Sequence, residues 1–137
     1  MQRNLSLLSL LLLMPITNVL AVEWTSIIKD AEHEVLVDID SYNVSDNHPY
    51  LDAKTVYQTP QTFTLSDDKV EYFTGLAKYQ FNCKKPLFRM RTITLMSKKN
   101  IPIDTIRISS GYQKLVMDTD EFSIGQLTCQ VHQMLGG

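Results

Sequence analysis

Two arginines that alternate along one segment are the residues whose possible chemistry is easiest to read from this sequence. Arg89 and Arg91 are separated only by Met90. In a β-strand, residues two apart point to the same side, so both guanidinium groups are expected on one face. Guanidinium and ammonium groups bind carboxylates, sulfates and phosphates. Together with nearby lysines they form a candidate basic cluster for an acidic ligand: Lys84, Lys85, Arg89, Arg91, Lys98 and Lys99.

The charges are distributed unevenly along the chain. Residues 22–72 contain 11 acidic side chains and three lysines, whereas residues 73–117 contain nine basic side chains and a single acid, Asp104. This asymmetry indicates an electropositive face for an acidic partner, such as a glycan, a lipid headgroup or an acidic protein segment. The alternative is that acidic and basic strands neutralise one another across a solvated sheet face. The sequence leaves both interpretations open.

The first 21 residues have the pattern of a cleavable secretory signal. Arg3 supplies the positive start, Leu5–Met14 is an almost unbroken apolar run, and the small side chain of Ala21 favours cleavage before Val22. We therefore expect a signal peptide over 1–21, a single mature domain over 22–137, and a periplasmic or secreted location. The apolar run is only about half the ~20 residues that span a bilayer. No membrane span is expected, and nucleic acid is not expected as the partner of an exported acidic protein.

Two cysteines, Cys83 and Cys129, lie in the mature part of the chain. In an oxidising compartment, an even pair of thiols most simply forms a disulfide. Two separate free thiols, one of them catalytic, are the alternative. No His or Asp residues cluster near either cysteine in the sequence, which favours the disulfide.

The common signatures of catalysis, cofactor binding and metal binding do not occur. There is no G-x-S-x-G, no phosphate-binding glycine loop and no H-E-x-x-H. His33, His48 and His132 are widely separated, and none has a second metal ligand at a usual spacing, so we interpret them as surface or turn histidines. The acidic segment that begins at Asp38 lacks the glycine and the glutamate of a calcium loop. We expect no enzymatic activity, no cofactor and no metal ion.

Alternating apolar and polar residues predict that most of the mature chain is β-strand. Strands are predicted at 34–39, 51–57, 77–83, 87–97 and 101–108, the last two joined by a hairpin turn at 98–100. Residues 41–49 are dense in turn-forming residues and 61–69 are polar, so both are predicted as loops. Pro60 is predicted to end the strand before the second loop.

The last segment changes to a helical period. Asp118 and Glu121 have the spacing of a capping box. The helix would have an apolar stripe made of Leu127, Val131, Met134 and Leu135. Cys129 would then lie opposite Leu127, whereas in a strand the two would share a face. The cap and the spacing favour the helix, and a strand is the alternative.

The order of several short motifs resembles the surface-adhesin protein E family of small exported Gram-negative proteins. These are Trp24, Ile27-Ile28, Val37–Ser41, Phe81-Asn82-Cys83 followed by basic residues, and a terminal element with Cys129. The resemblance implies an α+β fold, in which an antiparallel sheet of about six strands carries a C-terminal helix on one face, tied by a Cys83–Cys129 disulfide. The named member of the family binds host matrix proteins such as vitronectin and laminin.

This sequence departs from the family at the expected start of the mature chain. The family's adhesin is lipid-anchored through a cysteine there, whereas this chain has Val22 and no cysteine before Cys83. No lipid anchor is therefore expected. We expect an exported, non-enzymatic binding protein for a host matrix protein or an acidic glycan, with a periplasmic structural or envelope-assembly protein as the alternative. Pairing of two copies through an exposed strand edge also stays open.

Overall fold

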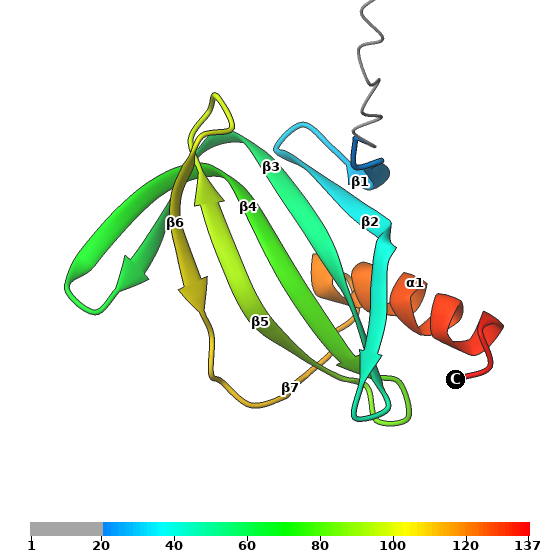
Figure 1. Cartoon of the computed structure of the whole chain (residues 1–137). Coiled ribbons are helices and arrows are strands. Elements are labelled where there is room, and N and C mark those ends of the chain that lie inside the picture. Colours follow the sequence, from blue (N-terminus) through cyan, green and yellow to red (C-terminus); the bar gives the residue numbers. More distant parts are fainter. Residues whose placement is uncertain (1–20) are drawn as a thin grey trace, which may run out of the picture.

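The computed structural model describes residues 21–137, which form an antiparallel sheet and one C-terminal helix (Figure 1). The predicted signal segment 1–21 lies outside these residues, apart from Ala21. The strands are β1 (Thr25–Lys29), β2 (His33–Ser45), β3 (His48–Leu65), β4 (Asp68–Asn82), β5 (Leu87–Met96), β6 (Pro102–Arg107) and β7 (Gln113–Lys114). Strands β1 to β6 follow one another across the sheet, and β7 pairs with the beginning of β5.

Both predicted loops, 41–49 and 61–69, were wrong, because strands joined by tight turns occupy these segments. Strand β2 continues to Ser45, and only Asp46 and Asn47 separate it from β3. Both turn residues have positive φ, 53° and 62°, which is the backbone of a two-residue hairpin turn that Asp and Asn tolerate. The predicted hairpin turn between β5 and β6 is confirmed, with Asn100 at φ 59°.

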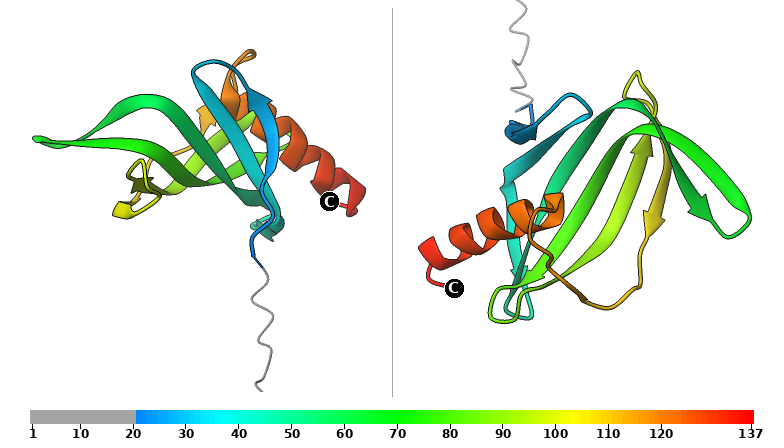
Figure 2. Two further views of the ribbon diagram at one scale, coloured as in Figure 1. Left: turned by 90° about the horizontal axis from the view of Figure 1, so that it is seen from above. Right: turned by 180° about the vertical axis from the view of Figure 1, so that it is seen from behind.

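The predicted loop at 61–69 is instead a two-stranded arm, in which Gln61–Leu65 of β3 pairs with Asp68–Tyr72 of β4. The arm extends beyond the other strands (Figure 2). Pro60 does not end the strand, because it lies in a register irregularity between Val56 and Gln61. A proline there removes no ladder hydrogen bond.

The core lies between the sheet and the helix α1 (Asp120–Met134), which crosses one face of the curved sheet (Figure 2). We call this the inner face and the opposite one the outer face. Alternate residues of the four middle strands point inward, and the helix adds Ile124. The buried apolar residues are Val35, Val37, Leu51, Ala53, Ala77, Tyr79, Phe81, Ile93, Leu95 and Ile124.

The helix is confirmed, but its cap and its buried side differ from prediction. Thr119 is the N-cap residue, and its hydroxyl accepts a hydrogen bond from the Phe122 N–H at 3.2 Å. Asp118, the predicted cap, has φ 64° and lies outside the helix. The helix buries Ile124, Gly125 and Thr128, whereas Met134 and Leu135 are exposed. The predicted stripe fails there because the last turns extend past the sheet (Figures 1 and 2).

The Cys83–Cys129 disulfide is confirmed, and it joins the end of β4 to the middle of α1. An antiparallel sheet with a C-terminal helix and one disulfide is therefore the observed fold. Because the sheet has seven strands and the helix 15 residues, the α+β description holds only in part. Within residues 21–137, no helix is long and apolar enough to cross a membrane.

Candidate functional site

Strand register gathers basic side chains on the outer face of the sheet. Lys78 of β4 pairs with Thr92 of β5, which pairs with Arg107 of β6. Two residues further along β4, Gln80 pairs with Arg89 of β5. Directly paired residues of neighbouring strands share a face. Three basic residues from three strands therefore lie side by side.

A β-bulge adds a fourth basic residue to this face. Lys78 pairs with Thr92, but the next residue of β4, Tyr79, pairs with Met90, so Arg91 is the extra residue of β5. A bulge re-aims the side chain of the bulged residue. The guanidinium of Arg91 lies 5.5 Å from the centre of the Tyr50 ring, and the ammonium of Lys78 lies 5.0 Å from the same centre.

These residues surround an open cavity of about 620 Å³ on the outer face, which we call the basic groove. Its wall is completed by the segment that follows β6. The lining residues are Tyr50, Lys78, Arg89, Arg91, Thr92, Arg107, Ile108, Ser109 and Ser110.

Within residues 21–137, the groove retains most of its positive charge. Lys78 contacts the Asp52 carboxylate at 2.9 Å, whereas no carboxylate of residues 21–137 lies within 4.0 Å of Arg89, Arg91 or Arg107. Apart from the Lys78–Asp52 pair, the acidic strands therefore do not neutralise the basic residues of the groove. Uncompensated charges in a concave site raise the local concentration of an oppositely charged ligand.

The six residues of the predicted basic cluster do not form a single site. Arg89 and Arg91 lie together in the groove, as their alternation indicated. Lys84 and Lys85 lie in the β4–β5 turn, beside the disulfide and at a second, polar cavity of about 940 Å³. Lys98 and Lys99 are exposed in the β5–β6 turn, beyond the other end of β5.

Sequence reasoning missed three groove residues: Tyr50, Lys78 and Arg107. Lys78 lies in the predicted strand 77–83, between the apolar residues Ala77 and Tyr79, and this alternation is a usable signal that it points away from the core. Arg107 joins the groove only through strand register. Tyr50 gave no signal, because it was not distinguishable from a core or strand tyrosine.

The three histidines, predicted as surface or turn residues, are half-buried, and each forms a hydrogen bond with a distant element. His33 bonds Asp120, His48 bonds Tyr112, and His132 bonds Tyr42. The three bonds hold the C-terminal segment against the sheet. Within the described part of the chain, no group of three or more His, Cys, Asp and Glu side chains is placed to hold a metal ion.

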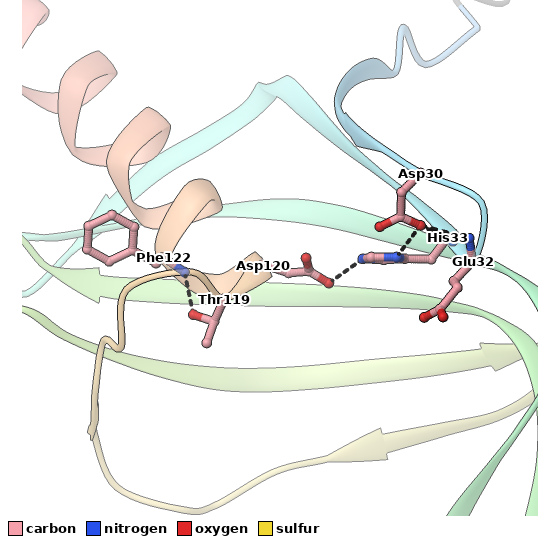
Figure 3. A network of polar contacts seen from close by, with 6 residues as sticks. All are labelled: Asp30, Glu32, His33, Thr119, Asp120 and Phe122. Carbon is pink, nitrogen blue, oxygen red and sulfur yellow. Dashed lines mark hydrogen bonds and ion pairs between the residues drawn. The ribbon is translucent and has the colours of Figure 1, made fainter.

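His33, the first residue of β2, lies between two carboxylates: Asp30 of the β1–β2 turn and Asp120 at the beginning of α1 (Figure 3). Its Nε2 is 2.8 Å from Asp120 Oδ2, and its Nδ1 is 3.1 Å from Asp30 Oδ1. The hydrogen bond to Asp120 is the main cause that raises the pKa of His33 above its usual 6.5, although desolvation opposes the shift. The backbone N–H groups of His33 and Glu32 donate to Asp30 and lower the pKa of that carboxyl.

The surroundings of His33 favour a structural ion pair over acid–base catalysis. Tyr57 stacks on the imidazole with ring centres 6.0 Å apart, and its pKa is raised to about 12 by burial, so its phenol stays protonated at neutral pH. A cavity of about 480 Å³ lies beside the pair, and besides His33, Glu32 and Asp120 its lining residues carry no charge: Ala31, Tyr57, Gln58, Thr59 and Gln61. The imidazole held between two carboxylates fixes the beginning of α1 on the β1–β2 hairpin, and its raised pKa extends the pH range over which it is charged.

This ion pair predicts a pH dependence of stability. Because the pKa of His33 is higher in the folded protein than its usual 6.5, its contribution is complete below that pH and is lost as the pH rises through the folded value. Wild type should therefore lose up to about 1 kcal/mol of unfolding free energy on going from mildly acidic to mildly alkaline pH, relative to His33→Gln. Urea unfolding of both proteins at the two pH values measures the difference.

Asp120→Asn is the matched control for that experiment. It removes the negative charge of the main partner of His33 while leaving the Thr119 cap in place (Figure 3). The pH dependence attributed to His33 should shrink in this variant, whatever its absolute stability. A difference between wild type and His33→Gln that is the same at both pH values would contradict the ion pair.

Comparisons of this chain with protein-family models, with curated proteins and with solved structures found no match.

Proposed function

We propose that this chain is an exported, non-enzymatic binding protein of the surface-adhesin E-like type, whose basic groove holds an acidic macromolecular partner. The observation that carries the proposal is the convergence of Lys78, Arg89, Arg91 and Arg107 on one concave surface, with a single carboxylate pairing among them. Complementary charge of this kind steers encounter and selects partners.

Export is supported by the disulfide, which persists in oxidising compartments and is rare in the cytosol. The predicted signal segment supports the same location. A binding role is also supported by the scaffold, because the groove is built mainly on paired strands. A site on rigid strands keeps its charges in place without a ligand.

The groove proposal is tested by removing two charges inside it and two outside it. In Arg91→Ser/Arg107→Ser, binding to immobilised heparin or polyglutamate, taken as acidic probes, should weaken by about tenfold or more, because each lost contact involves a charged group. Lys98→Ser/Lys99→Ser removes the same charge from an exposed turn. It should weaken binding by less than about threefold. Titrations at low and high salt provide the measurement.

Two results would contradict the groove as the binding site. Equal losses in the two double variants would mean that net charge alone determines binding. Wild-type binding that is insensitive to salt would mean that charge is not involved, because exposed charges are screened by salt.

The open edge of β6 favours a second candidate, a periplasmic structural or envelope-assembly protein. Among the strands of residues 21–137, β6 pairs only with β5, and Ile103 on it is 47% exposed. An open edge with an exposed apolar residue can accept a strand from a partner. Protease treatment of intact cells separates the two candidates, since a protein that acts at the surface is degraded and one that stays in the periplasm is protected.

A further inference from the structure

One guanidinium in the basic groove is held in a fixed orientation. Nε and Nη2 of Arg89 both donate to Oε1 of Gln80, at 3.0 and 2.7 Å. The ring of Tyr112 lies against the guanidinium, with its centre 4.9 Å from Cζ. Within residues 21–137, the side chains of Arg91 and Arg107 donate no comparable hydrogen bond. The four basic residues of the groove are therefore not equivalent.

The support of Arg89 is itself buried and fixed. Gln80 is only 1% exposed, and its Nε2 donates to the backbone oxygens of Ser45 and His48 at 3.1 and 3.2 Å. Because the amide nitrogen faces two carbonyls, the amide oxygen must face Arg89. An amide satisfied at both ends holds a single rotamer, and reversing it would leave buried polar atoms without partners.

Tyr112 is fixed by a separate contact. Its hydroxyl forms a 2.8 Å hydrogen bond with Nδ1 of His48, and the two rings meet edge to face with centres 5.3 Å apart. Arg89 is thus oriented by a neighbouring strand, by the β2–β3 hairpin and by the segment before β7. Such convergence on one side chain is typical of a preorganised binding group.

Arg89 keeps free donors for a ligand. A guanidinium has five N–H groups in a planar fork, and at least two of them are directed to Gln80. The others are on Nη1 and Nη2, where a planar pair of donors matches the oxygens of one carboxylate, sulfate or phosphate group. Holding the fork in advance reduces the entropy lost on binding.

The remaining lining residues favour a polysaccharide over a protein surface. Protein interfaces have an apolar centre, whereas Ile108 is the one aliphatic residue in this groove, beside the hydroxyl groups of Thr92, Ser109 and Ser110. Lys78 and Arg107 lie two strands apart, which is about 10 Å across a sheet. Cations spread in this way match a chain that carries repeated anionic groups.

We infer that Arg89, positioned by Gln80 and Tyr112, is the anchor that binds one oxyanion group of a sulfated or carboxylated polysaccharide. Lys78, Arg91 and Arg107 contact the neighbouring anionic groups through charge alone. The inference rests on the proposed function of the groove, and it adds the ligand class and the residue that determines specificity.

The test compares two substitutions that conserve charge. Arg89→Lys removes the fork and keeps the charge, and Arg91→Lys makes the same change at an arginine that Gln80 does not hold. The probe is a heparin-derived hexasaccharide, measured by calorimetric titration. Arg89→Lys should weaken binding by about tenfold with an unchanged salt dependence, since it loses charge-assisted hydrogen bonds. Arg91→Lys should weaken binding by less than about threefold.

A third variant tests the positioning and guards against misfolding. Tyr112→Phe keeps the ring against Arg89 but removes the hydrogen bond to His48. It should weaken binding of the hexasaccharide by a smaller factor than Arg89→Lys. Adding Arg91→Lys to Tyr112→Phe should weaken binding further only by the factor that Arg91→Lys causes alone. Circular dichroism melting shows whether each variant is folded.

The outcomes separate this inference from the proposed function. Equal effects of Arg89→Lys and Arg91→Lys would overturn the anchor, while the groove would still stand on the Arg91→Ser/Arg107→Ser result. Binding of polyglutamate without binding of the hexasaccharide would overturn the polysaccharide and leave an acidic protein as partner. If neither probe binds wild type, both the inference and the proposed function are wrong.

Discussion

Replacing Cys83 and Cys129 together by serine should lower the free energy of unfolding by about 4 kcal/mol. The disulfide closes a segment with a sequence separation of 46, which restricts the unfolded chain by about this amount in the loop-entropy treatment. The loss is large beside the ~5–15 kcal/mol that stabilises a typical domain. Urea unfolding of the oxidised wild type and of the double variant measures it.

The location of the disulfide predicts which part of the protein loosens in that variant. Ile124 and Gly125 at the beginning of α1 are buried against the sheet, whereas the residues after Cys129 are half-buried or exposed. Amide hydrogen exchange should therefore increase most in the second half of α1. Wild type under reducing conditions is the control, and its unfolding curve should coincide with that of the double variant.

A loss below about 1 kcal/mol would contradict this account of the disulfide. It would mean that packing and the Tyr42–His132 hydrogen bond hold the helix without the covalent link. Such a result would also weaken the argument for export, because a dispensable disulfide gives no reason for an oxidising compartment.

The sequence predicted the strands whose apolar side packs under the helix and missed the two-stranded arm, whose buried side is short. Residues 34–39 and 77–83 alternate because one side of each strand packs under the helix. The arm formed by 61–65 and 68–72 also alternates, and Phe63, Val70 and Tyr72 pack against the edge of the core. Its buried side is short and only partly covered, and polar residues surround these apolar ones, so the segment resembled a loop.

The groove was predictable only where one strand carries it. Arg89 and Arg91 are close in sequence, and their alternation indicated a shared face. Lys98 and Lys99 are almost as close in sequence, yet β5 separates them from the groove. Arg107 is farther along the chain but lies beside Thr92 through strand pairing. Register depends on contacts among several strands, and a single sequence does not specify it.

The structure confirms the predicted disulfide, whereas the function implied by the family-like order of motifs stays a prediction. The cysteine pair followed from residue count and compartment, and the structure confirms the bond. The sheet and helix agree with what the resemblance implies about fold. The adhesin function stays a proposal, which the groove supports through charge rather than through a shared motif.

Gly125 is the position where a small substitution should do the most damage. A Cβ atom at this position would lie 2.9 Å from Cε1 of Phe81, 3.0 Å from its Cδ1 and 3.1 Å from Cδ1 of Leu115. Atoms do not approach so closely, so either the helix or the Phe81 ring must move. The absence of a side chain at Gly125 is what lets α1 approach β4.

Phe81 has little freedom to move. It is fully buried, and its ring packs against those of Tyr79 and Phe88, with centres 6.3 and 6.5 Å away. Leu115 is half-buried and can shift, but it relieves only one of the three contacts. The helix itself is tied at Cys129, one turn further on. The buried ring of Phe81 and the disulfide at Cys129 therefore both oppose a displacement of α1.

Gly125→Val should destabilise the protein by about 3 kcal/mol, the upper part of the range for overpacked cores. The better helix propensity of valine recovers only a few tenths of a kcal/mol of this loss. Gly111→Val is the matched control, because nothing lies within 4 Å of its added Cβ, and it should change stability by less than about 0.5 kcal/mol. Chemical unfolding of both variants measures the difference. Equal stabilities would mean that α1 does not approach β4 this closely, and the helix that carries Cys129 would then need another arrangement on the inner face.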